Sequence, residues 1–404
     1  MLTPLCVLSL LLAGLRAATG PANDLEILWA AAVRLTTGGP LYDPDLAFIY
    51  PPLGGWVLAP LGLVPFETAH LTMVVLSTVA LVAAVVLALD LVGVPWWSPV
   101  TAGTLLVLAL SRPVVGLLGQ GNVDVPLVLA EVVVIRLLVA RRDVAAGALL
   151  GLVCALKPTL APAVLALVVL GRWRATAVTV GVGASLSVLG MALVRDGTVF
   201  VTDVLPLLQE GNRPELAGYN RSLHAAAQQL GVPISVELLA RAACVAIAVA
   251  VAWRRRHGPL AAAEVIPVLL LGGLLASAFS WANYSLYLLP LLVTVLVPGS
   301  LVRLWPAWVG VYLLWTTQPL PVLTLTPEAE AAVGLRPAWG WALLLLTCAV
   351  TAWRDPRPRP AAVGTADRDH GDGDVDLELD READEAPASA VPARPGHVDA
   401  AAAA

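Results

Sequence analysis

The chain has 404 residues, of which 58% are hydrophobic and only 13% are charged, and its mean hydropathy is +0.82. A soluble domain carries about 25% charged residues, so this composition excludes a soluble globular protein. The apolar runs are longer and more continuous than the alternating strands of an outer-membrane barrel. Because about 20 apolar residues cross a bilayer as a helix, the sequence predicts an all-α polytopic membrane protein.

The formal net charge of −5 does not describe the membrane body. The acidic excess lies in 354–404, which is rich in Pro, Asp, Glu and Ala and has few apolar residues. Such a composition does not bury a core. We therefore expect 1–353 to form the membrane domain and 354–404 to be a disordered, acidic cytoplasmic tail. The acidity says little about the substrate, and no basic cluster points to nucleic acid.

The cysteines give no sign of a metal or redox centre. They stand singly in apolar runs, at Cys6, Cys154, Cys244 and Cys348. This placement is typical of small buried hydrophobic side chains. Histidines and carboxylates do not cluster with ligand spacing either, so the sequence predicts no metal site and no evident cofactor.

The apolar runs predict about twelve transmembrane helices. Taken in chain order, they lie near 2–19, 67–92, 99–111, 123–140, 144–156, 158–170, 176–194, 236–253, 260–277, 284–299, 301–317 and 338–353. The first run lacks the basic start of a secretory signal, so we expect it to be a membrane helix. The runs on either side of Lys157-Pro158 are short. Because proline breaks a helix, they are either two short spans or one kinked hairpin.

Arginines in the short loops orient this arrangement. Twelve spans from a cytoplasmic N-terminus place all of these arginines on the cytoplasmic side: Arg141, Arg142, Arg172, Arg174, Arg254, Arg255, Arg256, Arg303, Arg354, Arg357 and Arg359. This agrees with the positive-inside rule. The long loops 20–66, 195–235 and 318–337 then face outward, and both termini are cytoplasmic.

Polar side chains gather in segments that this topology brings to the outer face. They come from the first outer loop (Asp24, Glu26, Asp43, Asp45), the end of the third span (Arg112, Gln120, Asn122, Asp124), the longest outer loop (Arg195, Asp196, Asp203, Glu210, Asn212, Arg213, Asn220, Arg221) and a further outer turn (Trp281, Asn283, Tyr284). A transporter instead concentrates such groups near the midplane. The distribution favours a site at the outer interface, open to lipid and to water.

The first outer loop contains a predicted interfacial helix. Residues 24–37 place apolar side chains at helical spacing around Trp29, with acidic residues first and a basic residue later. Asp24 stands at the start, where a carboxylate is favoured. It is therefore either an N-cap or a functional group. Tyr50, in the later segment 48–52, is either part of an aromatic belt or part of a site.

An ordered set of motifs then resembles a known family. The stretches are Asp24 with WAAAVRLTTGGPLYDP after it, FIYPPLGGWVLAPLGLVP at 48–65, GLLGQGNVDVPL at 116–127, AAGALLGLVCALKPTLAPAVL at 145–165, YNRSLHAAAQQLG at 219–231 and FSWANYSLYLLPLL at 279–292. Together they resemble glycosyltransferase family 87, of the membrane-embedded GT-C type, as found in actinobacteria. The resemblance covers about 1–353. It implies a GT-C fold in which the first outer loop carries a catalytic carboxylate.

The resemblance implies a membrane glycosyltransferase. Its members include polyprenol-phosphate-mannose-dependent mannosyltransferases and arabinofuranosyltransferases. Nucleotide sugars are cytoplasmic, so an outer-face site needs a sugar carried on a polyprenyl phosphate dissolved in the membrane. We expect mannose first and arabinofuranose next, transferred to a glycolipid or polysaccharide of the cell envelope. Membrane lipids and this donor are the expected partners. Asp24 is the expected general base on the acceptor hydroxyl.

The departing phosphate needs positive charge, and four residues are candidates: Lys157, Arg112, Arg213 and Arg221. Lys157 is the only lysine of the chain and stands at the Lys-Pro position of the family. A lysine there is costly unless it faces a polar cavity, which favours a functional role. Arg213 and Arg221 are equally well explained as solvated loop residues.

Binding of the sugar or the acceptor is assigned to seven residues: Glu26, Tyr50, Gln120, Asn122, Asn220, Trp281 and Asn283. The amides of Gln120 and Asn122 either hold sugar hydroxyls or satisfy backbone groups at a span end. Trp281 either stacks on a sugar or anchors the interface. Many family members carry a histidine just after this tryptophan, whereas this chain has Asn283. Asparagine does not accept a proton, so this chain relies on Asp24 or differs in substrate.

Two other functions remain open from the sequence. One is a transporter or flippase for a lipid-linked sugar, which would show inverted repeats and midplane charges. The other is an inactive relative that scaffolds envelope synthesis. An enzyme alone predicts that Asp24→Asn abolishes transfer while the protein still folds and inserts.

Overall fold

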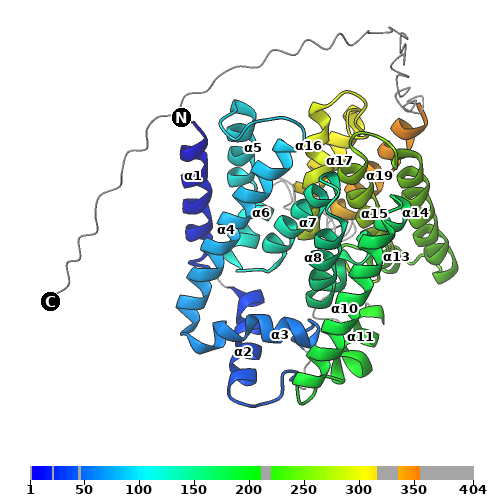
Figure 1. Cartoon of the computed structure of the whole chain (residues 1–404). Helices are drawn as coiled ribbons and strands as arrows, with labels where there is room; N and C mark the ends of the chain where they lie inside the picture. Colours follow the sequence, from blue (N-terminus) through cyan, green and yellow to red (C-terminus); the bar gives the residue numbers. More distant parts are fainter. Residues whose placement is uncertain (1, 21, 44–46, 211–219, 316–334, 355–404) are drawn as a thin grey trace, which may run out of the picture. The chain divides into compact units, whose positions relative to one another are not determined.

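The computed structural model describes residues 2–20, 22–43, 47–210, 220–315 and 335–354. Within these ranges the chain forms helices and connecting turns, without strands (Figure 1). The predicted all-α class is therefore confirmed. The acidic tail from 355 onward lies outside the described residues, so its disorder stays a prediction.

The helices follow one another along the chain with short connections. The first part contains α1 (Leu2–Ala17), α2 (Asn23–Thr36), α3 (Pro52–Leu58), η1 (Ala59–Leu63), α4 (Phe66–Asp90), α5 (Pro99–Leu110), α6 (Arg112–Gly119), α7 (Asp124–Val139), α8 (Asp143–Leu156), η2 (Pro158–Leu160), α9 (Pro162–Val169) and α10 (Trp173–Leu193). The second part contains η3 (Phe200–Val204), α11 (Leu205–Glu210), α13 (Leu223–Gln229), α14 (Ile234–Arg255), α15 (Ala261–Ala276), η4 (Ala282–Leu288), α16 (Leu289–Val293), η5 (Thr294–Leu296), α17 (Trp305–Trp315) and α19 (Arg336–Arg354).

Most predicted spans coincide with a helix to within a few residues. In the part of the chain that the structure describes, α4, α10 and α14 are long and apolar enough to cross a membrane, and several further apolar helices are shorter. The described part of the chain is thus helical and compatible with an all-α membrane protein, while the count of twelve spans stays a prediction. The run 284–299 is not one regular helix, because it divides into η4, α16 and η5. Pro290, which has no N–H to donate, stands at the start of α16.

The break at Lys157-Pro158 makes a hairpin of two short helices. Proline disfavours a helical backbone in the residue before it, and Lys157 is extended, with φ −152° and ψ 106°. Asp143 at the start of α8 pairs with Arg172 just after α9, with 3.3 Å between Oδ1 and Nη1. Because the start of α8 and the end of α9 meet in this ion pair, the two helices run in opposite directions. Lys157 therefore stands at the tip of the hairpin.

Small residues let α8 and α10 pack backbone to backbone. A Cβ added to Gly147 would lie 2.4 Å from the carbonyl oxygen of Ala175. One added to Gly151 would lie 2.7 Å from the carbonyl oxygen of Thr179. Any larger residue would separate the two helices. Close contact through small residues is the usual means of helix association in membranes, and here it fixes the hairpin that carries Lys157.

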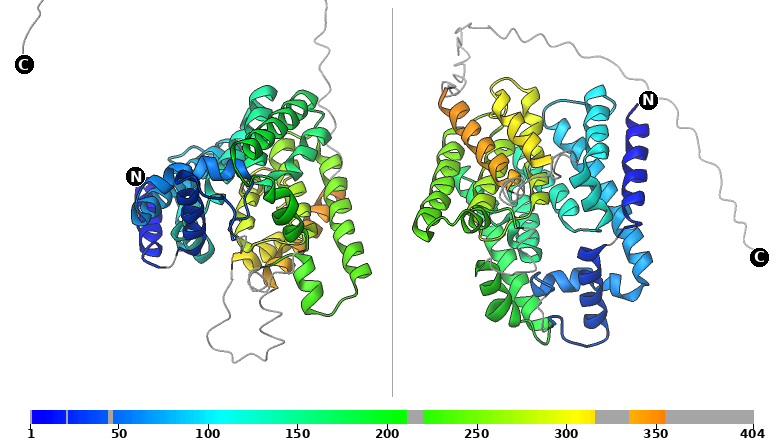
Figure 2. Two further views of the ribbon diagram at one scale, coloured as in Figure 1. Left: turned by 90° about the horizontal axis from the view of Figure 1, so that it is seen from below. Right: turned by 180° about the vertical axis from the view of Figure 1, so that it is seen from behind.

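The two ends of the membrane domain differ in composition. The start of α1 and the last residues of α19 lie at one end, whereas α2, α3 and α11 lie at the other (Figures 1 and 2). The helix ends and turns at the first end carry the ion pairs Arg136–Asp90, Arg172–Asp143 and Arg255–Glu264. The second end carries the segments that the sequence predicts to be outer loops.

The first predicted outer loop packs as a folded layer. Its helix α2 confirms the helix predicted at 24–37, and a Cβ on Gly62 of η1 would lie 2.5 Å from the Ala32 carbonyl carbon. Asp196 accepts hydrogen bonds from the backbone N–H groups of Leu41 and Tyr42, at 3.0 and 2.8 Å. The Tyr42 hydroxyl donates to the Tyr50 carbonyl oxygen at 2.9 Å. These contacts fix the segment that leads to Tyr50.

Candidate active site

Asp24 lies in the first turn of α2 but does not cap it. The N-cap is Ala22, without a side-chain hydrogen bond. The Asp24 carboxylate instead accepts a hydrogen bond from Asn122 Nδ2 at 2.6 Å. Burial raises the pKa of Asp24 above its ordinary value of 3.8, and the hydrogen bond from Asn122 partly opposes this rise. A raised pKa brings the carboxyl closer to the pH at which it can exchange a proton.

Asn122 joins α2 to α7. It follows Gly121, whose φ of +61° makes the turn between α6 and α7. A left-handed backbone of this kind favours glycine. While its Nδ2 donates to Asp24, the Asn122 Oδ1 accepts from the backbone N–H of Asp124 at 2.8 Å. Asn122 is fully buried, so both of its polar ends are committed to this junction.

Asp124 is a fully buried carboxylate at the start of α7. Its Oδ1 accepts from Lys157 Nζ at 2.5 Å and from the Tyr287 hydroxyl at 2.7 Å. Its Oδ2 accepts from Asn283 Nδ2 at 3.0 Å. A buried charge is stable only when it is paired and hydrogen-bonded, and Asp124 meets both conditions. It is therefore an anchor for three side chains from two other segments.

Lys157 places its ammonium group between Asp124 and two aromatic rings. Its Nζ lies 5.1 Å from the centre of the Tyr50 ring and 5.0 Å from that of Tyr284, which are cation–π distances. The Tyr50 hydroxyl lies 3.5 Å from Nζ. The side chain is only 10% exposed. The charge of this buried lysine is thus compensated by Asp124 and two aromatic rings, while its role in phosphate binding stays a prediction.

A cavity of about 860 Å³ opens beside these groups. Its polar wall contains Asp24, Lys157 and Tyr50 together with Thr159, Ser277, Ser280, Trp281 and Tyr284. The rest of the lining is largely apolar and includes Ile27, Leu28, Phe200, Leu205, Leu208 and Leu274. The cavity thus joins a charged region to a surface that suits a hydrocarbon chain. Asp124 is not among the lining residues.

Trp281 is a cavity-lining aromatic with an unused donor. Its ring stacks on that of Tyr284, with 6.4 Å between the centroids and 15° between the planes. Its buried Nε1 has no hydrogen-bond acceptor among the described residues. An indole N–H usually finds a partner when it is buried. An oxygen of a bound ligand would supply one.

The structure brings together only part of the predicted site. Asp24, Tyr50, Asn122, Lys157, Trp281 and Asn283 meet at or beside the cavity. Glu26 and Gln120 are exposed and do not line it. Asn220 is buried and bonds to backbone groups instead of facing the cavity.

The three predicted arginines are placed less fully. Arg221 is half-buried, and burial lowers its pKa. It does not line the cavity, although its backbone N–H donates to the carbonyl oxygen of Ser280, which does. Arg112 starts α6, but its side chain is outside the described part, and Arg213 lies outside the described residues. Their assignment to phosphate binding stays a prediction.

Sequence reasoning missed Asp124, Tyr284 and Tyr287 as site residues. Asp124 stands two residues after Asn122 in the same motif, and a carboxylate at the start of an apolar helix was a usable signal. Tyr284 directly follows Asn283, and Tyr287 comes three residues after Tyr284. A helical turn puts such positions on one face. Nothing in the sequence, however, says that this face meets α7.

The geometry gives the two carboxylates different capacities. Asp124 has both oxygens occupied by donors and is sealed from the cavity. Asp24 borders the cavity, and among the described residues it forms no ion pair. Only Asp24 is thus placed to take a proton from a bound molecule, while Lys157 offers positive charge on the same wall.

Comparison with known proteins agrees with this arrangement. The family model for glycosyltransferase family 87 matches residues 48–280. An alpha-(1->3)-arabinofuranosyltransferase of Mycobacterium tuberculosis is 29% identical over 338 residues, which cover 80% of this chain and 77% of the relative. The corresponding enzyme of Corynebacterium glutamicum is 26% identical over 346 residues, covering 82% and 81%. No solved structure gave a significant match.

A further relative carries a different sugar in its name. The polyprenol-phosphate-mannose-dependent alpha-(1-2)-phosphatidylinositol pentamannoside mannosyltransferase of Mycobacterium tuberculosis is 28% identical over 291 residues, covering 67% of this chain and 65% of the relative. The family match includes Tyr50, Asn122, Asp124 and Lys157, begins after Asp24 and ends one residue before Trp281. Since it spans more than half of the chain, the protein is a membrane-embedded enzyme of glycosyltransferase family 87.

Proposed function

We propose that this enzyme transfers a sugar from a polyprenyl-phosphate donor to a glycolipid or polysaccharide of the cell envelope at the outer face of the membrane. One observation carries the proposal: the same cavity is lined by the charged groups of Asp24 and Lys157 and, over most of its remaining lining, by apolar side chains. A lipid-linked sugar phosphate has the same division between a charged head and a hydrocarbon tail. A water-soluble nucleotide sugar has no use for the apolar wall.

The proposed reaction is a single displacement at the anomeric carbon. The acceptor hydroxyl oxygen forms a bond to that carbon as the bond from the carbon to the phosphate oxygen breaks. The hydroxyl proton passes to the Asp24 carboxylate, and the polyprenyl phosphate leaves with the bonding electrons. A positioned base of this kind is worth about 10²–10⁴-fold in rate. Asp124 does not compete for the role, because its oxygens already accept three hydrogen bonds.

Lys157 is the proposed contact for the donor phosphate. An ammonium group has three N–H donors. One N–H is donated to Asp124, and a second can be donated to the Tyr50 hydroxyl, which lies 3.5 Å from Nζ. The third N–H can then be donated to a phosphate oxygen. Because Asp124 neutralises much of this charge, the phosphate needs further positive groups. Arg112, Arg213 and Arg221 remain the proposed sources.

The relatives bear on the choice of sugar. The arabinofuranosyltransferases share a longer part of their length with this chain than the mannosyltransferase does. We therefore rank an arabinofuranosyl donor first and a mannosyl donor second, which reverses the order expected from the sequence. Asn283, in the position where many family members carry histidine, donates to Asp124. It acts as part of the anchor around Lys157, and the base function falls to Asp24.

The proposed membrane arrangement follows from the same end-to-end asymmetry. The arginine-rich turns with their ion pairs face the cytoplasm together with both termini, and the cavity faces outward. This orientation agrees with the positive-inside rule. It corresponds to a GT-C fold of about twelve spans with α2 as an interfacial helix.

The test is transfer in membranes with a panel of radiolabelled donors. The donors are polyprenyl-phospho-arabinofuranose, polyprenyl-phospho-mannose and a nucleotide sugar, with Asp24→Asn as the blank. We expect transfer from one lipid-linked donor, no transfer from the nucleotide sugar and loss of transfer in Asp24→Asn. Transfer that Asp24→Asn leaves unchanged would remove Asp24 from the mechanism. Donor movement across sealed vesicles without transfer would instead indicate a flippase.

A further inference from the structure

The cavity wall formed by residues 277–281 has no secondary structure of its own. It contributes Ser277, Phe279, Ser280 and Trp281 to the lining. An irregular segment needs partners for its backbone polar groups, because an unpaired buried N–H or C=O is costly. Here the partners of Ala278 and Ser280 come from a different part of the chain, at 220–222.

Asn220 is the centre of this support. Its Nδ2 donates to the Ala278 carbonyl oxygen at 2.9 Å, and its Oδ1 accepts from the backbone N–H of Ser280 at 3.1 Å. The same Oδ1 accepts from Ser222 N–H at 3.1 Å. The Ser222 hydroxyl also donates to Ala278 at 3.1 Å, and Arg221 N–H donates to Ser280 at 2.7 Å. The Asn220 side chain thus binds one backbone carbonyl and one backbone N–H of the wall segment.

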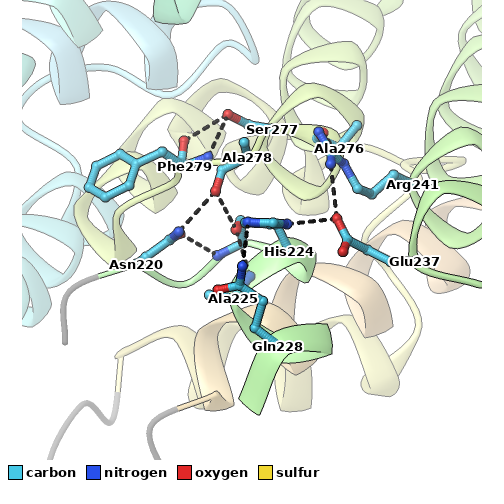
Figure 3. Close-up of polar contacts among 11 residues, drawn as sticks. Asn220, His224, Ala225, Gln228, Glu237, Arg241, Ala276, Ser277, Ala278 and Phe279 are labelled. Carbon is cyan, nitrogen blue, oxygen red and sulfur yellow. Dashed lines mark hydrogen bonds and ion pairs between the residues drawn. The ribbon is translucent and has the colours of Figure 1, made fainter. Parts of the chain in front are cut away.

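A second set of hydrogen bonds holds Ala276, the last residue of α15, directly before the segment. Arg241 of α14 donates from Nε to the Ala276 carbonyl oxygen at 2.7 Å and from Nη1 to Glu237 at 2.9 Å (Figure 3). The buried Glu237 carboxylate is also 2.8 Å from His224 Nδ1 of α13. Figure 3 shows Asn220 and Arg241 approaching the segment from different elements.

Asn220 cannot itself hold the substrate. It is only 1% exposed, it is not among the cavity-lining residues, and its acceptor already receives two hydrogen bonds. Asn220 is connected to the cavity by its hydrogen bond to Ser280, which lines the cavity and directly precedes Trp281. Trp281 has an unpartnered Nε1 and stacks on Tyr284, whose ring lies beside the Lys157 ammonium.

We propose that Asn220 is a positioning residue of the transfer reaction and acts by holding Trp281 in the cavity wall. Arg241 is the second positioning residue, at the other end of the same segment. This inference rests on the proposed function for its kinetic consequence. With the wall held before the substrate arrives, little ordering has to accompany binding. Loosening the wall therefore raises the KM for the lipid-linked donor more than it lowers kcat.

The kinetic test is a double-mutant cycle between Asn220→Asp and Trp281→Phe. Asn220→Asp keeps the shape and the acceptor but replaces the donor to Ala278 with an oxygen. We expect each single variant to raise the donor KM about tenfold, with kcat within about threefold of wild type. The donor KM of the double variant is expected to be no higher than that of the poorer single variant, because both substitutions disrupt the same contact of Trp281 with the donor. Effects that multiply would overturn the proposal.

A spectroscopic test separates this inference from the proposed function. The protein is labelled with 5-fluorotryptophan, and the Trp281 resonance is assigned as the one missing from Trp281→Phe. We expect Asn220→Asp to shift or broaden that resonance. Thr179→Val, which removes a buried hydroxyl bonded to Ala175 within α10, is the control and is expected to leave it in place. An unchanged Trp281 resonance in Asn220→Asp would contradict the positioning role, independently of the measured activity.

Arg241→Lys keeps the test decisive if Asn220→Asp does not insert. The lysine retains a cation near Glu237 but cannot bond Glu237 and Ala276 together as the guanidinium does. We expect the same perturbation of the Trp281 resonance and a smaller rise in KM, about threefold. Wild-type protein with no transfer from any lipid-linked donor would contradict the proposed function, while the resonance would still report on Asn220 and Arg241.

Discussion

The two ends of α7, α8 and α15 use charged residues in different ways. At one end Arg136–Asp90, Arg172–Asp143 and Arg255–Glu264 match each cation with one carboxylate. At the cavity end Lys157 has two carboxylates nearby, and it pairs with Asp124. Asp24 is the carboxylate left over, bonded only to an amide among the described groups. The comparison teaches that the paired charges hold the bundle, whereas Asp24, which borders the cavity without a cationic partner in the described part of the chain, is available for chemistry.

The largest expected effect is a difference in transfer activity between variants of an unpaired and a paired carboxylate. Among the described residues, Asp24 is the only carboxylate that borders the cavity, so Asp24→Asn should reduce transfer by about 10²–10⁴-fold. Asp143→Asn removes a paired carboxylate at the opposite end and should leave transfer within about twofold. Initial rates with the lipid-linked donor, normalised to folded protein, measure both. Similar losses in the two variants would erase the distinction between the ends.

The next effect concerns stability. Lys157→Met leaves the Asp124 carboxylate buried without its cation, which should cost about 3–5 kcal/mol of unfolding free energy. Arg172→Met breaks a partly exposed pair and should cost about 0–1 kcal/mol. Denaturation by SDS in mixed micelles measures the difference. Adding Asp124→Asn to Lys157→Met should restore much of the loss, and a further loss would show that the pair is not what stabilises this end.

The third effect is a shift with pH. Activity needs Asp24 ionised, so the acid limb of kcat/KM follows its pKa. Asn122 lowers that pKa by its hydrogen bond, against the larger effect of burial. Removing the donor in Asn122→Ala should therefore raise the pKa further and move the acid limb to higher pH. A pH profile of donor kcat/KM measures this, with Thr179→Val as the control that keeps the limb in place. A shift to lower pH would contradict the assignment of the base.

The smallest effect probes the apolar wall. Leu208→Asn places an amide on the surface proposed to take the hydrocarbon tail. We expect the KM for a long-chain donor to rise about three- to tenfold, and the KM for a short-chain donor to stay the same. Competition between donors of two chain lengths measures the ratio. An equal rise for both would assign this wall to the head group instead of the tail.

Sequence reasoning located most helices because lipid imposes long apolar runs on them. The runs at 67–92, 176–194 and 236–253 became α4, α10 and α14 with small changes at their ends. It succeeded less well where proline divides a run, as in η4 and α16, because periodicity does not tell a 3₁₀ turn from an α-helix.

The site was predictable at the level of segments and not of contacts. Asp24, Asn122 and Lys157 were expected at the outer face, and they meet at the cavity. Asn122 and Asn220 look alike in sequence, since each is an amide beside a helix start. One reaches Asp24 and the other a backbone turn, and only the packing of α7 and α13 decides which. Asp124 was missed for the same reason, because its role depends on hydrogen bonds from three side chains that are distant in sequence.

The unmatched carboxylate has a consequence for inhibitor design. Glycosyl transfer develops positive charge on the sugar ring, as the oxocarbenium-like transition states of glycosidases do. A ring that carries a permanent positive charge would meet Asp24 without displacing an existing cation, because no described side chain forms an ion pair with it. A cationic sugar mimic joined to a hydrocarbon tail would thus contact both the carboxylate and the apolar side chains that line the cavity. Selectivity over enzymes that bind soluble donors would come from the tail, and potency from the charge.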